Sequence, residues 1–143
     1  MAALFGKAWI PSEVRGEVLS GQVSRGESGI RKAMADGWLC EWPGSPTGKA
    51  PLVTLPDLDE GEAACIRIAI AHADEALLLI DERAGRAVAT ECGLRVAGTA
   101  AVIGMAKARG LVPSARQVFD TLHRSDFRIS ADVIQTVLRR VGD

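Results

Sequence analysis

The sequence has few aromatic residues: they occupy 4% of its 143 positions, and tyrosine is absent. Proteins that bind single-stranded nucleic acid on a sheet stack the bases on several aromatic side chains. The composition therefore excludes base stacking as the main mode of binding. A net charge of −1 likewise argues against a polybasic protein that binds nucleic acid by neutralising many phosphates.

Long hydrophobic runs and paired cysteines are also lacking. The longest uncharged stretch, residues 96–106, is far shorter than the ~20 apolar residues that a membrane-spanning helix needs. Residues 1–5 are too few for the apolar region of a signal peptide, so we expect a cytoplasmic protein without a membrane partner. Three cysteines without C-x-x-C spacing argue against both a disulfide framework and a zinc site.

The composition that remains, 48% apolar and 24% charged, is typical of a soluble globular protein of about one domain. Hydrophobic spacing and capping residues predict helices over residues 12–20, 27–36, 59–73, 82–92, 99–109, 113–123 and 130–141. Short strands are predicted over residues 7–10, 38–42, 76–80 and 94–97, with a loop over residues 43–56. Alternating strands and helices indicate a single α/β domain over residues 1–143, with three layers and a small, mainly parallel sheet.

Acidic residues form three groups, each close to a predicted helix. Asp81 and Glu82 follow the third predicted strand, and open parallel sheets bind ligands beyond the carboxyl ends of their strands. Glu62 lies at the start of one predicted helix, and Glu17 lies on the first one. Capping is the alternative role, because Asp81 can start a helix and Asp59 has capping-box spacing to Glu62. Carboxylates without histidine or cysteine partners match the oxygen ligands of Mg²⁺ or Mn²⁺.

Five short segments, in this order along the chain, resemble signature segments of small prokaryotic PIN-like proteins. They are residues 58–63 (LDEGEA), 78–86 (LLIDERAGR), 93–99 (GLRVAGT), 110–114 (GLVPS) and 127–130 (FRIS). Residues 9–11 (WIP) and Glu17 also resemble the region of the family's first helix. The likeness covers nearly the whole chain, and five segments in sequence are quite specific.

The resemblance implies a nuclease that cleaves single-stranded RNA with Mg²⁺ or Mn²⁺, in many cases a toxin held by an antitoxin protein. Asp81 would then be a metal ligand, and Glu62 a metal ligand or the general base. Glu82 would be a further metal ligand, although the family more often has aspartate at its position. Glu17 would be an accessory acid. PIN-like toxins commonly form dimers, so a second copy of the chain is a candidate partner.

The beginning of the sequence departs from the family pattern. Family members begin with a strand that carries the first metal-binding aspartate, and residues 1–4 are too few to supply it. That strand would be central, between residues 7–10 and 76–80, and its loss would leave backbone groups unpaired. Three explanations stay open: the start is misassigned or trimmed, a neighbouring chain lends a strand, or the sheet closes directly and the site is defunct.

The charges are distributed unevenly along the chain. Residues 1–82 carry 7 basic and 13 acidic side chains, whereas residues 83–140 carry 10 basic and 4 acidic ones. An acidic part that can hold metal and an arginine-rich part that can hold phosphate fit a nuclease. Arg83 and Arg86 would contact phosphate, with surface ion pairs as the alternative.

The leading hypothesis is therefore a PIN-like endoribonuclease of the toxin–antitoxin type. The alternative is a non-catalytic PIN relative that binds RNA or a partner protein. A third interpretation is a phosphoacceptor domain in which Asp81 is the modified residue.

Overall fold

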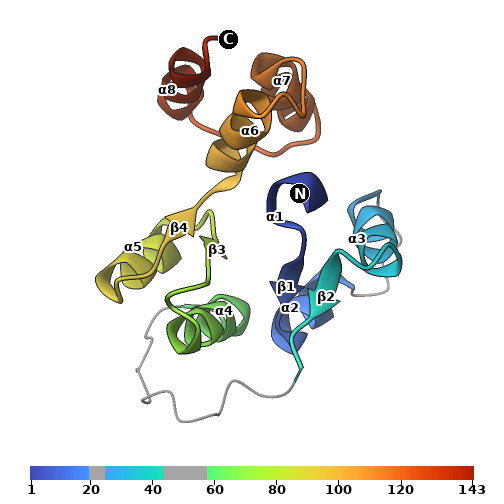
Figure 1. Cartoon of the computed structure of the whole chain (residues 1–143), viewed down its shortest axis with the longest axis vertical. Coiled ribbons are helices and arrows are strands. Elements are labelled where there is room, and N and C mark those ends of the chain that lie inside the picture. The colour runs from blue at the N-terminus through green and yellow to red at the C-terminus, as the bar shows by residue number, and fades with distance from the viewer. Residues whose placement is uncertain (20–24, 44–57) are drawn as a thin grey trace. The chain divides into compact units, whose positions relative to one another are not determined.

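A computed structural model describes residues 1–19, 25–43 and 58–143 of the chain. The chain divides into two compact units, unit 1 (Met1–Val96) and unit 2 (Ala97–Asp143). Unit 1 combines short strands with helices, and unit 2 consists mainly of helices (Figure 1). The α/β class and the parallel pairing expected from the sequence are confirmed. The single domain expected over residues 1–143 stays a prediction.

Unit 1 follows the predicted alternation of strands and helices. Its elements are α1 (Ala2–Phe5), β1 (Ala8–Ile10), α2 (Ser12–Val18), α3 (Arg25–Ala35), β2 (Leu39–Glu41), α4 (Glu60–Ala71), β3 (Leu78–Leu79), α5 (Arg83–Glu91) and β4 (Val96–Ala97). β4 ends on the first residue of unit 2. Each of these strands lies inside a predicted range, whereas α1 was not predicted. Nearly all of the predicted loop over residues 43–56 lies outside the described residues.

The first sheet of unit 1 pairs β1 with β2 in parallel. The register places Trp9 opposite Cys40. The Ala8 amide donates to the carbonyl oxygen of Trp38 at 2.7 Å, and the Trp42 amide donates to that of Ile10 at 2.7 Å. Parallel strands require a crossover connection, which α2 and α3 provide here.

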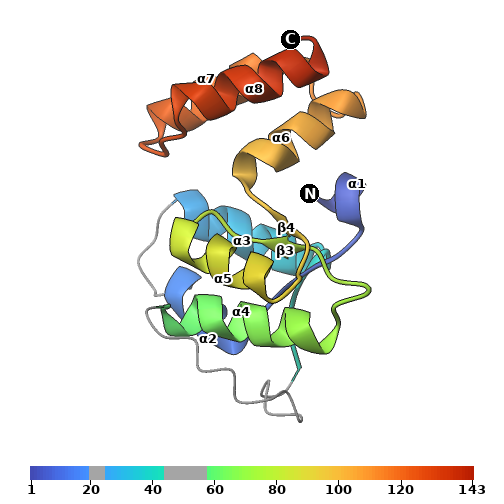
Figure 2. The same ribbon diagram turned by 90° about the vertical axis from the view of Figure 1, so that its left-hand side faces the viewer.

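The second sheet of unit 1 pairs β3 with β4 and lies in the hydrophobic core. The Leu78 amide donates to the carbonyl oxygen of Arg95 at 2.9 Å. The buried residues of this core are Ile66, Ala69, Leu78, Ala89 and Leu94, from α4, α5 and the segments around both strands. α2 packs against α4, so the first and second halves of unit 1 are in contact (Figure 2).

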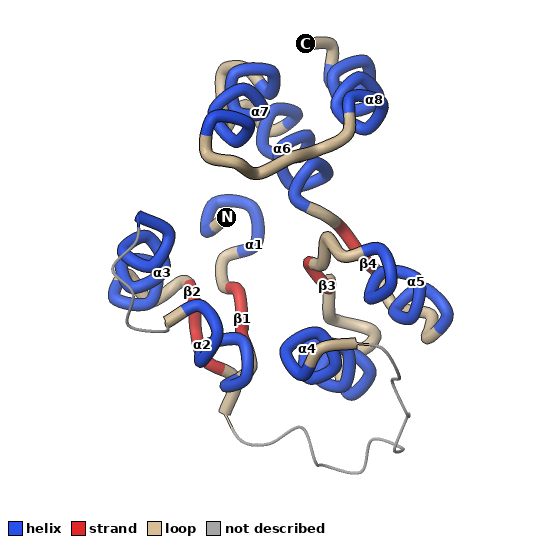
Figure 3. The backbone as a smooth tube through the Cα atoms, turned by 180° about the vertical axis from the view of Figure 1, so that it is seen from behind, coloured by secondary structure: helices blue, strands red, loops and turns tan. Residues whose placement is uncertain are grey.

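The two sheets of unit 1 are not joined to each other. Among the described residues, β1 is hydrogen-bonded to β2 and β3 to β4, with no pairing between β1 and β3 (Figure 3). Direct closure of the sheet, one of the three explanations for the absent first strand, is therefore not what the structure shows. Within the described sheets, each of β1 and β3 is paired on one side only.

Unit 2 contains three helices around a small core of its own. They are α6 (Thr99–Ala108), α7 (Ala115–Arg124) and α8 (Ala131–Val141). Ile103, Ala115, Phe119 and Leu138 form their buried core. α7 and α8 lie close to the predicted helices over residues 113–123 and 130–141, and a serine caps each: Ser114 accepts a hydrogen bond from the Gln117 amide, and Ser130 accepts one from the Val133 amide. In neither unit is a described helix long and apolar enough to cross a membrane.

Candidate functional site

One cavity of unit 1, of about 890 Å³, is lined by all the predicted site acids. Glu17 comes from α2, Asp59 and Glu62 come from the start of α4, and Asp81 and Glu82 follow β3. The spacing of these residues along the sequence could not show that they converge. In the folded chain, the three acidic groups border the same space.

Asp59 is fixed by its role at the start of α4. It is the N-cap residue, and its Oδ1 accepts a hydrogen bond from the Glu62 amide at 2.8 Å. The capping role considered for this pair is therefore confirmed for Asp59. The same contact places Glu62 in the first turn of the helix, where the helix dipole favours negative charge.

The pKa of Glu62 is raised above its usual value. Burial is the largest cause, followed by the negative charges of Asp59 and Glu82, and the charge of Glu17 acts in the same direction. A hydrogen bond with the backbone of Asp59 opposes the increase. Neighbouring negative charges disfavour ionisation. Glu62 is thus within the electrostatic influence of acids from three parts of the chain.

Two glycines allow the carboxylates to approach the helices closely. A Cβ atom at Gly61 would lie 3.1 Å from Oε1 of Glu17. A Cβ atom at Gly85 would lie 2.6 Å from Cδ1 of Ile80 and 3.5 Å from Cδ of Glu62. Glu17 therefore lies against the first turn of α4, and Glu62 lies against the first turn of α5.

Asp81 and Glu82 occupy the exposed turn between β3 and α5. Glu82 is the N-cap residue of α5, but its side chain makes no capping hydrogen bond. Asp81 precedes the cap position, contrary to the alternative in which it starts the helix. Both carboxylates lie near the positive end of the α5 dipole.

The acidic lining fits a divalent metal ion in its chemistry, because Mg²⁺ and Mn²⁺ prefer carboxylate oxygens. Its geometry is not that of a closed ligand set. Over residues 1–19, 25–43 and 58–143, no three histidine, cysteine, aspartate or glutamate side chains are placed to hold one metal ion. The cavity therefore offers the right type of ligand without a complete set.

Arg83 and Arg86 are exposed on the first two turns of α5. Within the part of the chain that the structure describes, neither forms an ion pair. The surface ion pairs considered as an alternative are therefore absent there. Their contact with phosphate stays a prediction.

A family model described as a PIN domain matches residues 1–143, the full length of the chain. The chain belongs to the PIN domain family. No curated protein and no solved structure matches it. PIN domains are in general nuclease-type domains that act on nucleic acid and depend on divalent metal ions.

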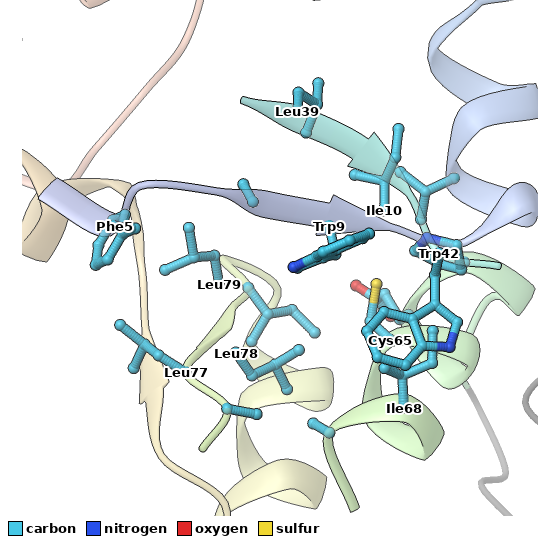
Figure 4. A pocket seen from close by; sticks show the side chains of 18 of the residues that line it. Phe5, Trp9, Ile10, Leu39, Trp42, Cys65, Ile68, Leu77, Leu78 and Leu79 are labelled. Carbon is cyan, nitrogen blue, oxygen red and sulfur yellow. The ribbon is translucent and has the colours of Figure 1, made fainter. Parts of the chain in front are cut away.

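The remaining walls of the cavity in this PIN domain are mainly apolar. Phe5, Trp9, Trp42, Leu77 and Leu79 lie around it (Figure 4). The Trp9 side chain is 48% exposed, and its ring centre lies 5.5 Å from that of Trp42 at an interplanar angle of 78°. Trp9 is therefore a half-exposed residue of the cavity wall and not part of the buried core.

Two lining residues of this PIN domain carried no signal in the sequence. His72 lies with its ring centre 5.0 Å from that of Trp42, at an angle of 65°. Cys65 is a wall residue, and burial raises the pKa of its thiol to about 11. The thiol is therefore protonated and unreactive at neutral pH. Both residues are isolated in the sequence, so only the packing of α4 shows that they face the cavity.

Proposed function

We propose that this PIN domain is a metal-dependent endoribonuclease of the toxin–antitoxin type that cleaves single-stranded RNA. One observation carries the proposal: acids from α2, from the start of α4 and from the end of β3 line one cavity. The raised pKa of Glu62 supports it, because this carboxyl group responds to charges from each of these regions. Structural caps alone would not require such a gathering of like charges.

In this proposal Asp81 and Glu62 are metal ligands, and Glu82 is a further ligand. A bound Mg²⁺ or Mn²⁺ would activate water and stabilise the charge that develops on the phosphodiester. Glu62 is the candidate general base, because a raised pKa brings a carboxylate closer to the value at which it takes up a proton efficiently. Glu17 is an accessory acid that adds to the negative charge around Glu62.

Arg83 and Arg86 are proposed to bind the phosphates of the RNA. Both are exposed on α5, the helix that starts immediately after Asp81 and Glu82. A guanidinium group presents several donors in a plane and binds phosphate oxygens in pairs. RNA held by α5 would therefore have its backbone close to the acidic end of the cavity.

The proposal includes a cytoplasmic location and an antitoxin protein as partner. A homodimer, or a neighbouring chain that lends a strand, is the other form of partner that it allows. Size-exclusion chromatography with light scattering distinguishes a monomer from these assemblies.

A second function is favoured by one observation, the lack of a closed set of metal ligands among the described residues. In this alternative the chain is a non-catalytic PIN relative that binds RNA or a protein. RNA binding would then survive removal of metal by EDTA and would also survive the Asp81→Asn substitution.

The test is cleavage of a fluorescent single-stranded RNA by the purified chain with Mn²⁺ or Mg²⁺, compared with Asp81→Asn. We expect metal-dependent cleavage that falls at least about 100-fold in Asp81→Asn, since removing one group that stabilises the transition state typically costs that much. Asp120→Asn is the matched control, because Asp120 is exposed on α7 of unit 2. Absence of cleavage by the unsubstituted chain with either metal would contradict the enzymatic function of the chain as it stands.

A further inference from the structure

One end of unit 2 gathers residues from each of its three helices. There the last turn of α6, the first turn of α7 and the last turn of α8 meet (Figure 2). Asp143 joins them, because its Oδ2 accepts hydrogen bonds from the Ser114 hydroxyl and the Arg116 amide, each at 3.1 Å. Its Oδ1 lies 3.6 Å from Nζ of Lys107, which also donates to the Pro113 carbonyl oxygen at 2.9 Å. These contacts hold the three helix ends together.

The charged residues at this end are mostly basic. Residues 105–117 and 138–143 include one acidic side chain, Asp143, and five basic ones. The basic residues are Lys107, Arg109, Arg116, Arg139 and Arg140. The other end of unit 2, residues 122–133, has two arginines and two aspartates, and Asp120 lies between the two ends on α7. Positive charge is therefore concentrated at one end of the unit.

Helix stability does not explain the whole cluster. Arg139 and Arg140 lie in the last turn of α8, where the helix dipole favours a cation. Arg116 lies in the first turn of α7, where the dipole disfavours one. Arg139 and Arg140 are exposed, and across the described parts of the chain neither forms an ion pair. Their charges are therefore available to a ligand.

The same end already binds one oxyanion, the carboxylate of Asp143. The hydrogen bond from the Arg116 backbone is the main reason that the pKa of Asp143 is lowered, and Ser114 and Lys107 act in the same direction. Phosphate oxygens accept the same kinds of charge-assisted hydrogen bond as carboxylate oxygens. The donors at this end are thus arranged to stabilise negative charge, and Arg139 and Arg140 add exposed positive charge beside them.

We propose that this basic end of unit 2 binds the phosphodiester backbone of single-stranded RNA, through residues that are not part of the acidic cavity. The ligand is taken from the proposed function, on which this inference rests. Each guanidinium group can bind two phosphate oxygens at once. Because phosphates are the same at every nucleotide, this surface would hold RNA without regard to its sequence. Selection of the cleavage position is then left to unit 1.

The chemistry of the surface favours RNA over an acidic protein. Protein interfaces have an apolar core from which charged residues are depleted. Within residues 105–117 and 138–143, all of which the structure describes, Leu111 is the one large apolar residue with an exposed side chain. Five cations around a single exposed leucine suit a polyanion, whose contacts are mainly electrostatic.

The test is the binding of a fluorescein-labelled oligouridylate of about 12 nucleotides, measured by fluorescence anisotropy in about 100 mM salt with EDTA. EDTA removes divalent metal ions, so binding is measured without cleavage. We expect Arg139→Gln/Arg140→Gln to bind at least about tenfold more weakly than the unsubstituted chain, because two phosphate contacts are lost. Each contact with a single strand contributes about 0.7 to the slope of log affinity against log salt, so the slope should become shallower by about 1.4.

The matched control is Arg124→Gln/Arg128→Gln, which removes the same charge from the other end of unit 2 and should keep the affinity. Arg139→Lys/Arg140→Lys retains the charge and should keep most of the affinity, which separates lost charge from a folding defect. Equal weakening by the two glutamine variants, or no weakening by Arg139→Gln/Arg140→Gln, would overturn the inference. Absence of RNA binding by the unsubstituted chain would overturn it too. Equal or tighter binding of a labelled oligoglutamate of the same length would assign the surface to an acidic protein instead.

The outcome for this surface is independent of the outcome for the nuclease. A chain that binds RNA through Arg139 and Arg140 but does not cleave it with Mn²⁺ would contradict the proposed enzyme and leave this inference intact. A chain that cleaves RNA, while both glutamine variants bind it as tightly as the unsubstituted chain, would do the reverse.

Discussion

The two units of the chain differ in how their backbone N–H and C=O groups form hydrogen bonds and in how their apolar side chains are buried. Unit 2 is built from helices whose hydrogen bonds are internal, around a core in which Phe119 is 1% exposed. Unit 1 is built on two small sheets, and its apolar residues Trp9, Leu77 and Leu79 border an open cavity. Helices close their own hydrogen bonds, whereas each strand depends on a neighbour on both sides.

The units also differ in what their acidic residues do. In unit 2, Asp143 accepts hydrogen bonds from the Ser114 hydroxyl and from the Arg116 amide, each at 3.1 Å. In unit 1, Glu62 lies among other acids, and its pKa is raised. The Asp143 carboxylate therefore stabilises unit 2, whereas the negative charge of Glu62 is disfavoured in unit 1, as is common where residues are arranged for function.

The largest expected effect is the loss of the core of unit 2. Phe119→Ala removes the largest of its buried side chains, and such truncations cost about 3 to 5 kcal/mol of unfolding free energy. Trp9→Ala, on the open wall of unit 1, should cost less than about 1 kcal/mol in the 143-residue chain. Urea unfolding followed by circular dichroism measures both. An equal loss of unfolding free energy in the two variants would contradict the contrast between the buried core of unit 2 and the open cavity wall of unit 1.

A smaller loss of stability is expected when Asp143 becomes protonated at low pH. Its pKa is lowered, mainly by the hydrogen bond from the Arg116 backbone, with contributions from Ser114 and Lys107. A lowered pKa in the folded state means that this stabilisation is present above the unfolded pKa of about 3.9 and is lost as the pH falls through the folded value. We therefore expect the melting temperature to fall below about pH 4 more steeply in the unsubstituted chain than in Asp143→Asn.

The control for this measurement is Asp120→Asn on the exposed face of α7, which should keep the acid dependence of the unsubstituted chain. If Asp143→Asn keeps the same dependence too, the hydrogen bonds around Asp143 do not stabilise unit 2.

The smallest expected effect is a rise in melting temperature, and it comes from removing the charge of Glu62 in unit 1. The pKa of Glu62 is raised in the folded state, so folding favours the protonated carboxyl group. Ionisation of Glu62 therefore lowers the stability of unit 1 as the pH rises from the unfolded pKa through the folded one. Glu62→Gln should therefore raise the melting temperature by about 1 to 3 °C at pH 7, and this gain should shrink near pH 4. All three tryptophans lie in unit 1, so their emission reports this transition.

Glu60→Gln is the matched control, because Glu60 shares the first turn of α4 but is not among the charges that act on Glu62. Glu60→Gln should leave the melting temperature at pH 7 unchanged. A lower melting temperature for Glu62→Gln would indicate that the carboxylate stabilises unit 1 and would weaken the case for an electrostatically strained site.

The starts of the helices could be predicted from short-range chemistry. Asp59, Ser114 and Ser130 each accept a hydrogen bond from an amide three residues ahead, which is a property of neighbouring residues alone. The strands were predicted in the right places but too long: β3 spans Leu78–Leu79 instead of residues 76–80. A strand ends where its partner ends, and that length depends on a distant part of the chain.

The sequence by itself determined the family, the α/β class, the helix caps and which acids are candidates for the site. These properties depend on residue type and on contacts within one or two helical turns. Only the tertiary structure decided that Glu17, Glu62, Asp81 and Glu82 border one cavity, because close packing at Gly61 and Gly85 brings distant segments together. It also decided that β1 and β3 face that cavity with open edges, since strand pairing is a long-range contact that spacing along the chain does not encode.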